Sequence, residues 1–144
     1  MFDTTELLTN IHKLDSALVR LADRTLQSEY GLGMSQFKIL WILKKHQGGV
    51  LQTNIAEWSN QTEAAVSRQI RLLKADKLIE KKTDPKNRRN RMIVLSKTGK
   101  QFAEQAMERL KVEYRPLLSV LKPGEQKQLN QMCERVFYKV TDNL

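Results

Sequence analysis

The stretch from Leu51 to Gly99 places the strongest constraint on how this chain can fold. Its first half has the apolar spacing of two short helices joined by a tight turn. Its second half has the pattern of two strands, from Leu78 to Asp84 and from Arg91 to Leu95, joined by a turn rich in proline and asparagine. A very short third strand is expected at residues 50–51. The stretch therefore predicts a helix-turn-helix followed at once by a hairpin.

The chain before this stretch has the pattern of a long helix and a shorter one. From about Asp3 to Glu29 the apolar residues fall on one stripe, which comprises Leu7, Ile11, Leu14, Leu18, Leu21 and Leu26. Gly31 and Gly33 are expected to end this helix, and Ser35 opens the next one. A stripe on so long a helix needs a partner helix, either within the chain or from a second copy.

Two more helices are expected after the hairpin. Ser96 can cap the first of them, which Pro116 must kink or split. Pro123 suits the first turn of the last helix. The apolar stripe of that helix comprises Leu129, Met132, Cys133, Val136, Phe137 and Val140. The chain is therefore predicted to be mainly α, with about six helices and a small antiparallel sheet of two to three strands.

The second helix of the helix-turn-helix has two different faces. Val66, Ile70 and Leu73 lie in a narrow arc and are predicted to face the core. The opposite arc combines two arginines with small or polar side chains: Gln61, Ala64, Ser67, Arg68, Arg71 and Ala75. Small side chains between arginines would let this face enter a nucleic-acid groove. An ordinary solvated helix face is the alternative.

Two caps are open for the start of this helix. Asn60 is followed three residues later by Glu63, which is the spacing of a capping box. Thr62 is the other candidate, because a threonine hydroxyl can accept a hydrogen bond from a backbone N–H of the first turn. The sequence does not decide between Asn60 and Thr62.

Positive charge is concentrated in the predicted hairpin. From Lys81 to Arg91 there are six basic residues and one acidic residue, a net charge of +5 out of +9 for the chain. A solvated, evenly charged surface would not show this clustering, which favours contact with nucleic acid. The residues expected to make that contact are Lys81, Lys82, Lys86, Arg88, Arg89 and Arg91.

Other classes of function find little support. The single cysteine, Cys133, lies on an apolar stripe and is predicted to be buried and structural. His12 and His46 lie far apart with no cysteine or carboxylate cluster near them, so we expect no metal site. With no set of nucleophile, base and orienting residue, we expect neither enzyme activity nor a cofactor. One cysteine, no signal peptide and no long apolar run point to a cytoplasmic protein.

A spacing pattern in the hairpin adds a family resemblance. Asn87-Arg88-Arg89, then five residues to Leu95-Ser96, then Gly99 resembles the pattern Asp-x-Arg, five residues, Leu-Thr, two residues, Gly of the MarR family of transcription regulators. Ala65-Val66-Ser67-Arg68 is similar to the recognition helix of that family. Two positions differ, because Asn87 stands in the aspartate position and Ser96 in the threonine position. Asp84 is close enough to replace that aspartate in bracing Arg89.

The resemblance implies a single domain over 1–144 with a winged helix-turn-helix over 34–99. Residues 1–33 and 100–144 would then be dimerisation helices. It further implies a homodimeric repressor that binds pseudo-palindromic double-stranded DNA. Arg89 would enter the minor groove, and Ser67 and Arg68 would contact phosphate and base edges in the major groove.

The resemblance also makes a small aromatic or phenolic effector plausible. Trp41, Phe37 and Tyr30 could line a cavity for it, although ordinary core packing is favoured for Trp41 and Phe37. The competing class of function is a winged-helix module that binds proteins, or that binds nucleic acid without sequence preference.

Overall fold

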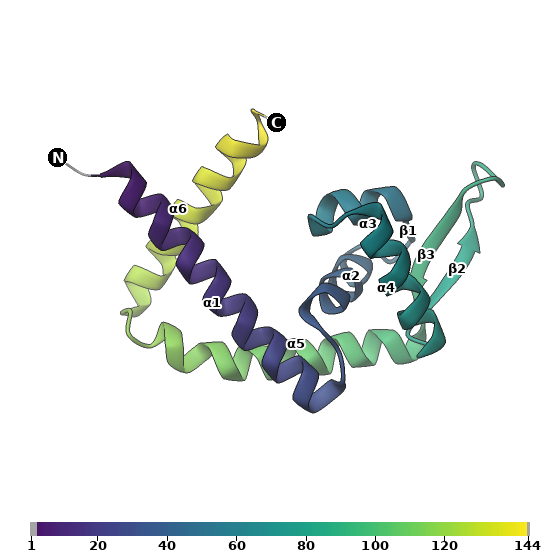
Figure 1. The fold of residues 1–144 in the computed structure, drawn as a ribbon, viewed down its shortest axis with the longest axis horizontal. Coiled ribbons are helices and arrows are strands. Elements are labelled where there is room, and N and C mark those ends of the chain that lie inside the picture. The colour runs from purple at the N-terminus through teal and green to yellow at the C-terminus, as the bar shows by residue number, and fades with distance from the viewer. Residues whose placement is uncertain (1–2, 144) are drawn as a thin grey trace. The chain divides into compact units, whose positions relative to one another are not determined.

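The structure is a computed structural model that describes residues 3–143, and within them it has six helices and three strands (Figure 1). In chain order these are α1 Thr4–Tyr30, α2 Met34–Lys45, β1 Val50–Leu51, α3 Gln52–Ser59, α4 Glu63–Ala75, β2 Ile79–Thr83, β3 Arg91–Leu95, α5 Lys97–Leu118 and α6 Pro123–Thr141. The predicted fold class is thus confirmed. The chain divides into two compact units, Met1–Met107 and Glu108–Leu144, which we describe separately.

The core of the first unit surrounds α2, which contacts α1, α3, α4 and β3. The side chains at its centre are apolar and at most 3% exposed: Leu26, Phe37, Ile39, Leu40, Leu43, Ile55, Val66, Ile70, Leu73 and Ile93. Burying one such side chain contributes about 1.5–3 kcal/mol. The three predicted core residues of α4 are among them, so that helix has a fixed inner face.

The sheet has the strand order β1-β3-β2, and both pairings are antiparallel. The short third strand predicted at residues 50–51 is present and pairs with β3, with Val50 opposite Ile93. β2 buries Ile79 and exposes its other residues, whereas β3 buries its last three. The far end of the β2–β3 hairpin projects beyond the helices of the unit (Figure 1).

The turn between α3 and α4 corrects one expectation and selects one alternative. Asn60 has φ of 53° and is the left-handed C-cap of α3, so the capping box proposed for Asn60 and Glu63 is wrong. Thr62 is the N-cap of α4, and its Oγ1 accepts a hydrogen bond from the Ala65 N–H at 3.1 Å. An asparagine tolerates the left-handed conformation that a tight turn needs, and this use of Asn60 excluded the other.

The second unit contains the end of α5 and all of α6. α5 continues through Pro116 and ends shortly afterwards at Leu118, so the proline neither splits it nor begins a new helix. The Gln126 amide then donates hydrogen bonds to the carbonyl oxygens of Leu118 and Leu121, each at 3.0 Å. These bonds fix the turn that leads into α6.

The apolar stripe of α6 and the N-terminal part of the α1 stripe are uncovered in the single chain. Large apolar side chains more than 40% exposed include Leu7, Leu8, Ile11, Leu14, Leu129, Met132, Val136, Phe137 and Val140. Cys133 is also exposed, so its predicted burial is wrong for one copy of the chain. The periodicity located the stripe correctly, but the prediction assumed that the chain itself would cover it.

The end of α4, the base of the hairpin and the start of α5 meet at one serine. Ser96 Oγ donates to the Lys77 carbonyl oxygen at 2.7 Å and accepts from the Gly99 N–H at 2.9 Å, which caps α5 as predicted. The Ser96 N–H donates to the Leu78 carbonyl oxygen at 3.0 Å. The approach is so close that a Cβ on Gly99 would lie 1.9 Å from that same oxygen.

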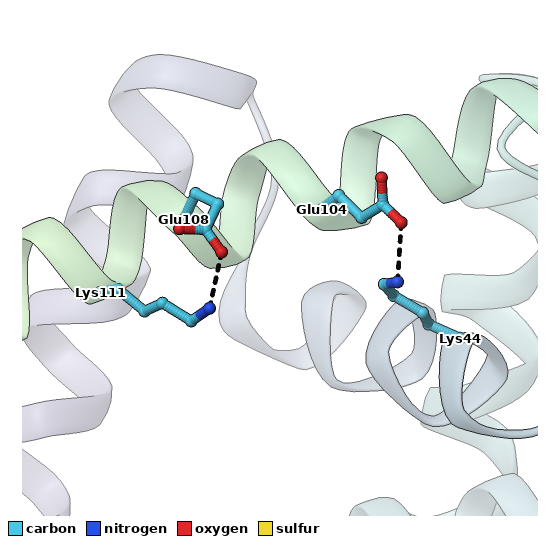
Figure 2. Close-up of polar contacts among 4 residues, drawn as sticks. All are labelled: Lys44, Glu104, Glu108 and Lys111. Atoms are coloured by element: carbon cyan, nitrogen blue, oxygen red, sulfur yellow. Dashed lines mark hydrogen bonds and ion pairs between the residues drawn. The ribbon is translucent and has the colours of Figure 1, made fainter.

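α5 forms an ion pair within each of the two units (Figure 2). In the first unit the Lys44 ammonium lies 2.8 Å from a Glu104 carboxylate oxygen, which joins α2 to the start of α5. The hydrogen bond and the charge of Lys44 lower the pKa of Glu104. In the second unit Lys111 and Glu108 pair at 2.6 Å along the helix. Pairs this exposed add little stability.

Replacing Gly99 with alanine tests the close approach at the junction. The added methyl would meet the Leu78 backbone, so Gly99→Ala should lower the free energy of unfolding by about 1–3 kcal/mol in urea titrations. Gly124→Ala is the matched control, because Gly124 also lies in a first helical turn but has no atom within 4 Å of its added Cβ. It should raise stability by up to about 1 kcal/mol. Equal effects of the two changes would contradict the predicted clash.

Candidate nucleic-acid interface

The outer face of α4 presents the side chains that the sequence predicted there. Ala64, Ser67, Arg68 and Arg71 are all exposed, whereas Val66, Ile70 and Leu73 on the other face are at most 1% exposed. Neither arginine has an ion-pair partner among residues 3–143. The face therefore presents the guanidinium groups of Arg68 and Arg71, which have no ion-pair partner among the described residues, beside the small side chains of Ala64 and Ser67.

Gln61 does not lie on the outer face of α4, where the sequence placed it. It lies in the turn before α4, which begins at Glu63. Its side-chain amide donates a hydrogen bond to the Ser35 carbonyl oxygen at 3.1 Å, and the residue is half-buried. Gln61 therefore fastens the turn to the start of α2. The sequence placed it on the helix because helical spacing was extended past the cap.

The tip of the hairpin, residues 84–90, is shaped by two side chains that bond to the backbone. Asp84 Oδ1 accepts from the Lys86 N–H at 2.9 Å, and Asn87 Oδ1 accepts from the Arg89 N–H at 3.1 Å. Such bonds to the residue two positions on are typical of turn-forming aspartate and asparagine. Together they curl the tip so that its basic side chains, Lys86, Arg88 and Arg89, are exposed.

Bracing of Arg89 by an acidic residue is absent in the described part of the chain. Asp84 uses an oxygen to hold the Lys86 amide and forms no ion pair with Arg89, so it does not take over the bracing role considered for it. Asn87 contacts the backbone of Arg89 and not its guanidinium. The Arg89 side chain is thus free to reorient.

Arg91 lies at the base of this tip, not at its end. It pairs with Thr83 across the two strands, and its Nη1 donates to Thr83 Oγ1 at 2.6 Å. Sequence reasoning named Arg91 but missed Thr83. The signal was available, because a hairpin with this turn places these two residues opposite each other.

The three aromatic residues proposed to line an effector cavity have structural contacts. Phe37 is 3% exposed and stacks on Trp41, with ring centroids 6.2 Å apart. Tyr30 meets the edge of Phe102 at 5.3 Å, and its hydroxyl donates to the Gln105 carbonyl oxygen. Phe37 is therefore a core residue, as the favoured alternative held.

An open hollow of about 390 Å³ lies elsewhere in this unit. It is bounded by β1 and the turn before it, one side of α3, β3 and the start of the hairpin tip: Gly48, Gly49, Val50, Leu51, Asn54, Trp58, Asp84, Pro85, Lys86 and Met92. Trp58 is 49% exposed and its ring lies 4.8 Å from that of His46. None of the predicted effector residues borders this hollow.

Two further features were sought in the part of the chain that the structure describes. Residues 3–143 contain no group of three or more His, Cys, Asp or Glu side chains that could hold a metal ion. No helix in that range is both long enough and apolar enough to cross a membrane.

Comparison with known proteins gives a consistent result. Residues 32–90 match the model of the MarR family. The chain is similar in structure to a MarR/EmrR family transcriptional regulator from Acinetobacter sp. ADP1, with a TM-score of 0.80, 22% identity and 99% of each chain covered. Apo wild-type MarR from E. coli gives 0.80 and 18% identity over 94% of this chain and 98% of that one.

A structure of MepR from S. aureus in complex with DNA is also similar, with a TM-score of 0.75 and 23% identity over 96% of this chain and 99% of that one. No curated protein sequence matches the chain significantly. The family model covers the helix-turn-helix and the hairpin tip, and the solved structures share the fold of nearly the whole chain. Residues 32–90 are thus similar to the MarR family, and nearly the whole chain has the fold of the solved winged helix-turn-helix structures.

Proposed function

We propose that the chain is a sequence-specific repressor that binds a pseudo-palindromic operator in double-stranded DNA as a homodimer. The observation that carries the proposal is that one compact unit exposes unpaired arginines at two places, on α4 and at the wing tip, residues 84–90. A helix fits the major groove, and a thin hairpin can reach an adjacent minor groove. No enzyme activity and no cofactor is part of the proposal.

In the major groove α4 supplies base readout. The planar fork of arginine pairs with O6 and N7 of guanine, so Arg68 and Arg71 are the candidates for that contact. Ala64 and Ser67 let the helix backbone approach the bases, and Ser67 can bond a phosphate. Gln61 would contribute by holding the turn before the helix, given its bond to Ser35.

The β2–β3 hairpin, which is the wing of the fold, supplies the second contact. Arg88 and Arg89 are suited to a narrow, A·T-rich minor groove, where the negative potential is deepest. Lys81, Lys82, Lys86 and Arg91 would meet phosphates, which adds affinity without sequence choice. Because these contacts release counterions, binding should weaken steeply with added salt.

Dimerisation is supported by the uncovered apolar stripes of α1 and α6. Exposed apolar faces of this length mark an interface that a second copy can cover. Residues 1–33 and 100–144 would form that interface and residues 34–99 the DNA-binding region. In a two-fold dimer the recognition helices must lie about 34 Å apart to meet successive major grooves.

Two finer parts complete the proposal. Relief of repression by a small aromatic effector follows from the family, while Phe37 serves the core in this chain. A cytoplasmic location accords with a regulator of transcription. The alternative function, a winged helix that binds proteins or any DNA, would use the same basic wing.

Selection of bound DNA from a random pool tests the proposal. We expect enrichment of one palindromic sequence whose half-sites are about one helical turn apart, and salt-sensitive binding to it far above random DNA. Weak, equal binding to all sequences would refute a sequence-specific regulator and favour the alternative.

Loss of Arg68 should relax specificity. Arg68→Ala removes a bidentate donor, so affinity for the selected operator should fall by about 1–3 kcal/mol, with lost preference at one base pair per half-site. Fluorescence anisotropy against single-base variants of the operator would measure this. Arg24→Ala removes the same charge from an exposed site on α1 and should leave the base preferences intact. An unchanged profile for Arg68→Ala would remove Arg68 from base readout.

Loss of Arg89 should act on the flanks of the operator. Arg89→Ala should weaken binding chiefly to operators with A·T-rich flanks, because the arginine depends on a narrow minor groove. Lys86→Ala is the control in the same turn. It should weaken all operators alike and lower the salt dependence by about one phosphate contact. If both variants behave as Lys86→Ala does, the wing contacts phosphates only.

A further inference from the structure

Glu63 is an acidic residue at the start of an otherwise basic or neutral outer surface of α4. It is the first residue of the helix and is exposed. Thr62 caps the helix, and Asn60 closes α3, so Glu63 has no capping-box role. Among the described residues its carboxylate has no ion pair or hydrogen bond. The structure therefore leaves this charge without a partner among residues 3–143.

Its position groups it with two residues of the proposed DNA surface. Glu63, Ser67 and Arg71 follow one another at intervals of four residues, so they form a row along one side of α4. All three are exposed. Neighbouring members of such a row are about 6 Å apart along the axis, a separation comparable to two base-pair steps. An acid, a hydroxyl and an arginine thus stand in line on one side of the helix.

A carboxylate near DNA is selective because it only accepts hydrogen bonds. Phosphates repel it, and so do the O6 and N7 of guanine and the O4 of thymine, which are acceptors too. In the major groove the cytosine N4 amino group is a donor with no acceptor atom of its own base beside it, and glutamate pairs with it. At this position a carboxylate therefore penalises most bases and rewards cytosine.

We propose that Glu63 is a specificity-determining residue that accepts a hydrogen bond from the N4 amino group of one cytosine in each half-site. The inference rests on the proposed function, because it places α4 in the major groove. It adds a base preference that the two arginines do not supply, since both of them seek guanine. It also gives the unpartnered carboxylate of Glu63 a specific hydrogen-bond donor, the N4 amino group of cytosine.

An alternative role for Glu63 is purely structural. An acidic residue in the first turn stabilises a helix through the macrodipole. That role requires the negative charge but no contact with a base. It predicts that Glu63→Gln lowers the melting temperature and leaves the selected DNA sequence unchanged. It also predicts that Glu63→Asp, which keeps the charge on a shorter side chain, behaves as the wild type does in every assay.

The test compares wild type, Glu63→Gln and Glu63→Asp in selection from a random DNA pool. We expect one position per half-site at which the wild type selects cytosine and both variants have lost that preference. Glutamine can bond adenine there, so a shift toward adenine in Glu63→Gln would also support the inference. Melting temperatures measured alongside should stay near that of the wild type for Glu63→Asp, which shows that the variant is folded.

A modified base then isolates the contact. At the identified position the cytosine is replaced by 2-pyrimidinone, which lacks the N4 amino group. The wild type should lose about 10-fold in affinity, and Glu63→Gln should lose less than about twofold. A wild type that tolerates the modified base, or a consensus that wild type and Glu63→Gln share, would overturn this inference and leave the proposed function standing. A wild type that selects no sequence would overturn both.

Discussion

Three backbone segments meet at Ser96, and the geometry of the proposed DNA-binding surface depends on this junction. The Ser96 hydroxyl ties Lys77, which lies just beyond the C-cap of α4, to the first turn of α5, and the Ser96 N–H holds the base of the β2–β3 hairpin. Lys77, whose carbonyl oxygen accepts the hydrogen bond from the Ser96 hydroxyl, has a left-handed φ of 59°. Because α4 ends and the β2–β3 hairpin begins at this junction, it fixes the two elements proposed to contact DNA relative to each other.

Most of the fold could be predicted because periodicity and turn chemistry are local signals. The three core residues of α4, the hairpin and the short β1 strand follow from them directly. The two wrong predictions, for Asn60 and Cys133, depend on contacts that a local sequence pattern does not specify. Asn60 could serve either of two helices, and the left-handed turn decided which. Cys133 lies on a true apolar stripe, but periodicity does not say whether the chain or another molecule covers it.

The sequence predicted which residues lie at the candidate site better than it predicted how their side chains are hydrogen-bonded. Charge clustering located the wing, and helical spacing located Arg68 and Arg71 on the outer face. What the sequence could not show was how polar side chains are already used. Gln61 and Arg91 were considered as free groups and Asp84 as a brace for Arg89, and each is instead bonded elsewhere in the chain. Such commitments depend on three-dimensional distances of a few ångströms, which spacing along the chain does not encode.

The unbraced Arg89 has a consequence for the thermodynamics of its proposed insertion into a minor groove. A guanidinium held by a carboxylate has lost its rotamer freedom before DNA arrives, whereas Arg89 keeps that freedom until it binds. An arginine side chain carries about 2 kcal/mol of rotamer entropy, part of which is lost when it is fixed in the groove. Binding through this wing should thus carry a larger unfavourable entropy than binding through a braced one. In exchange, the side chain can take whichever rotamer a particular narrow, A·T-rich minor groove requires.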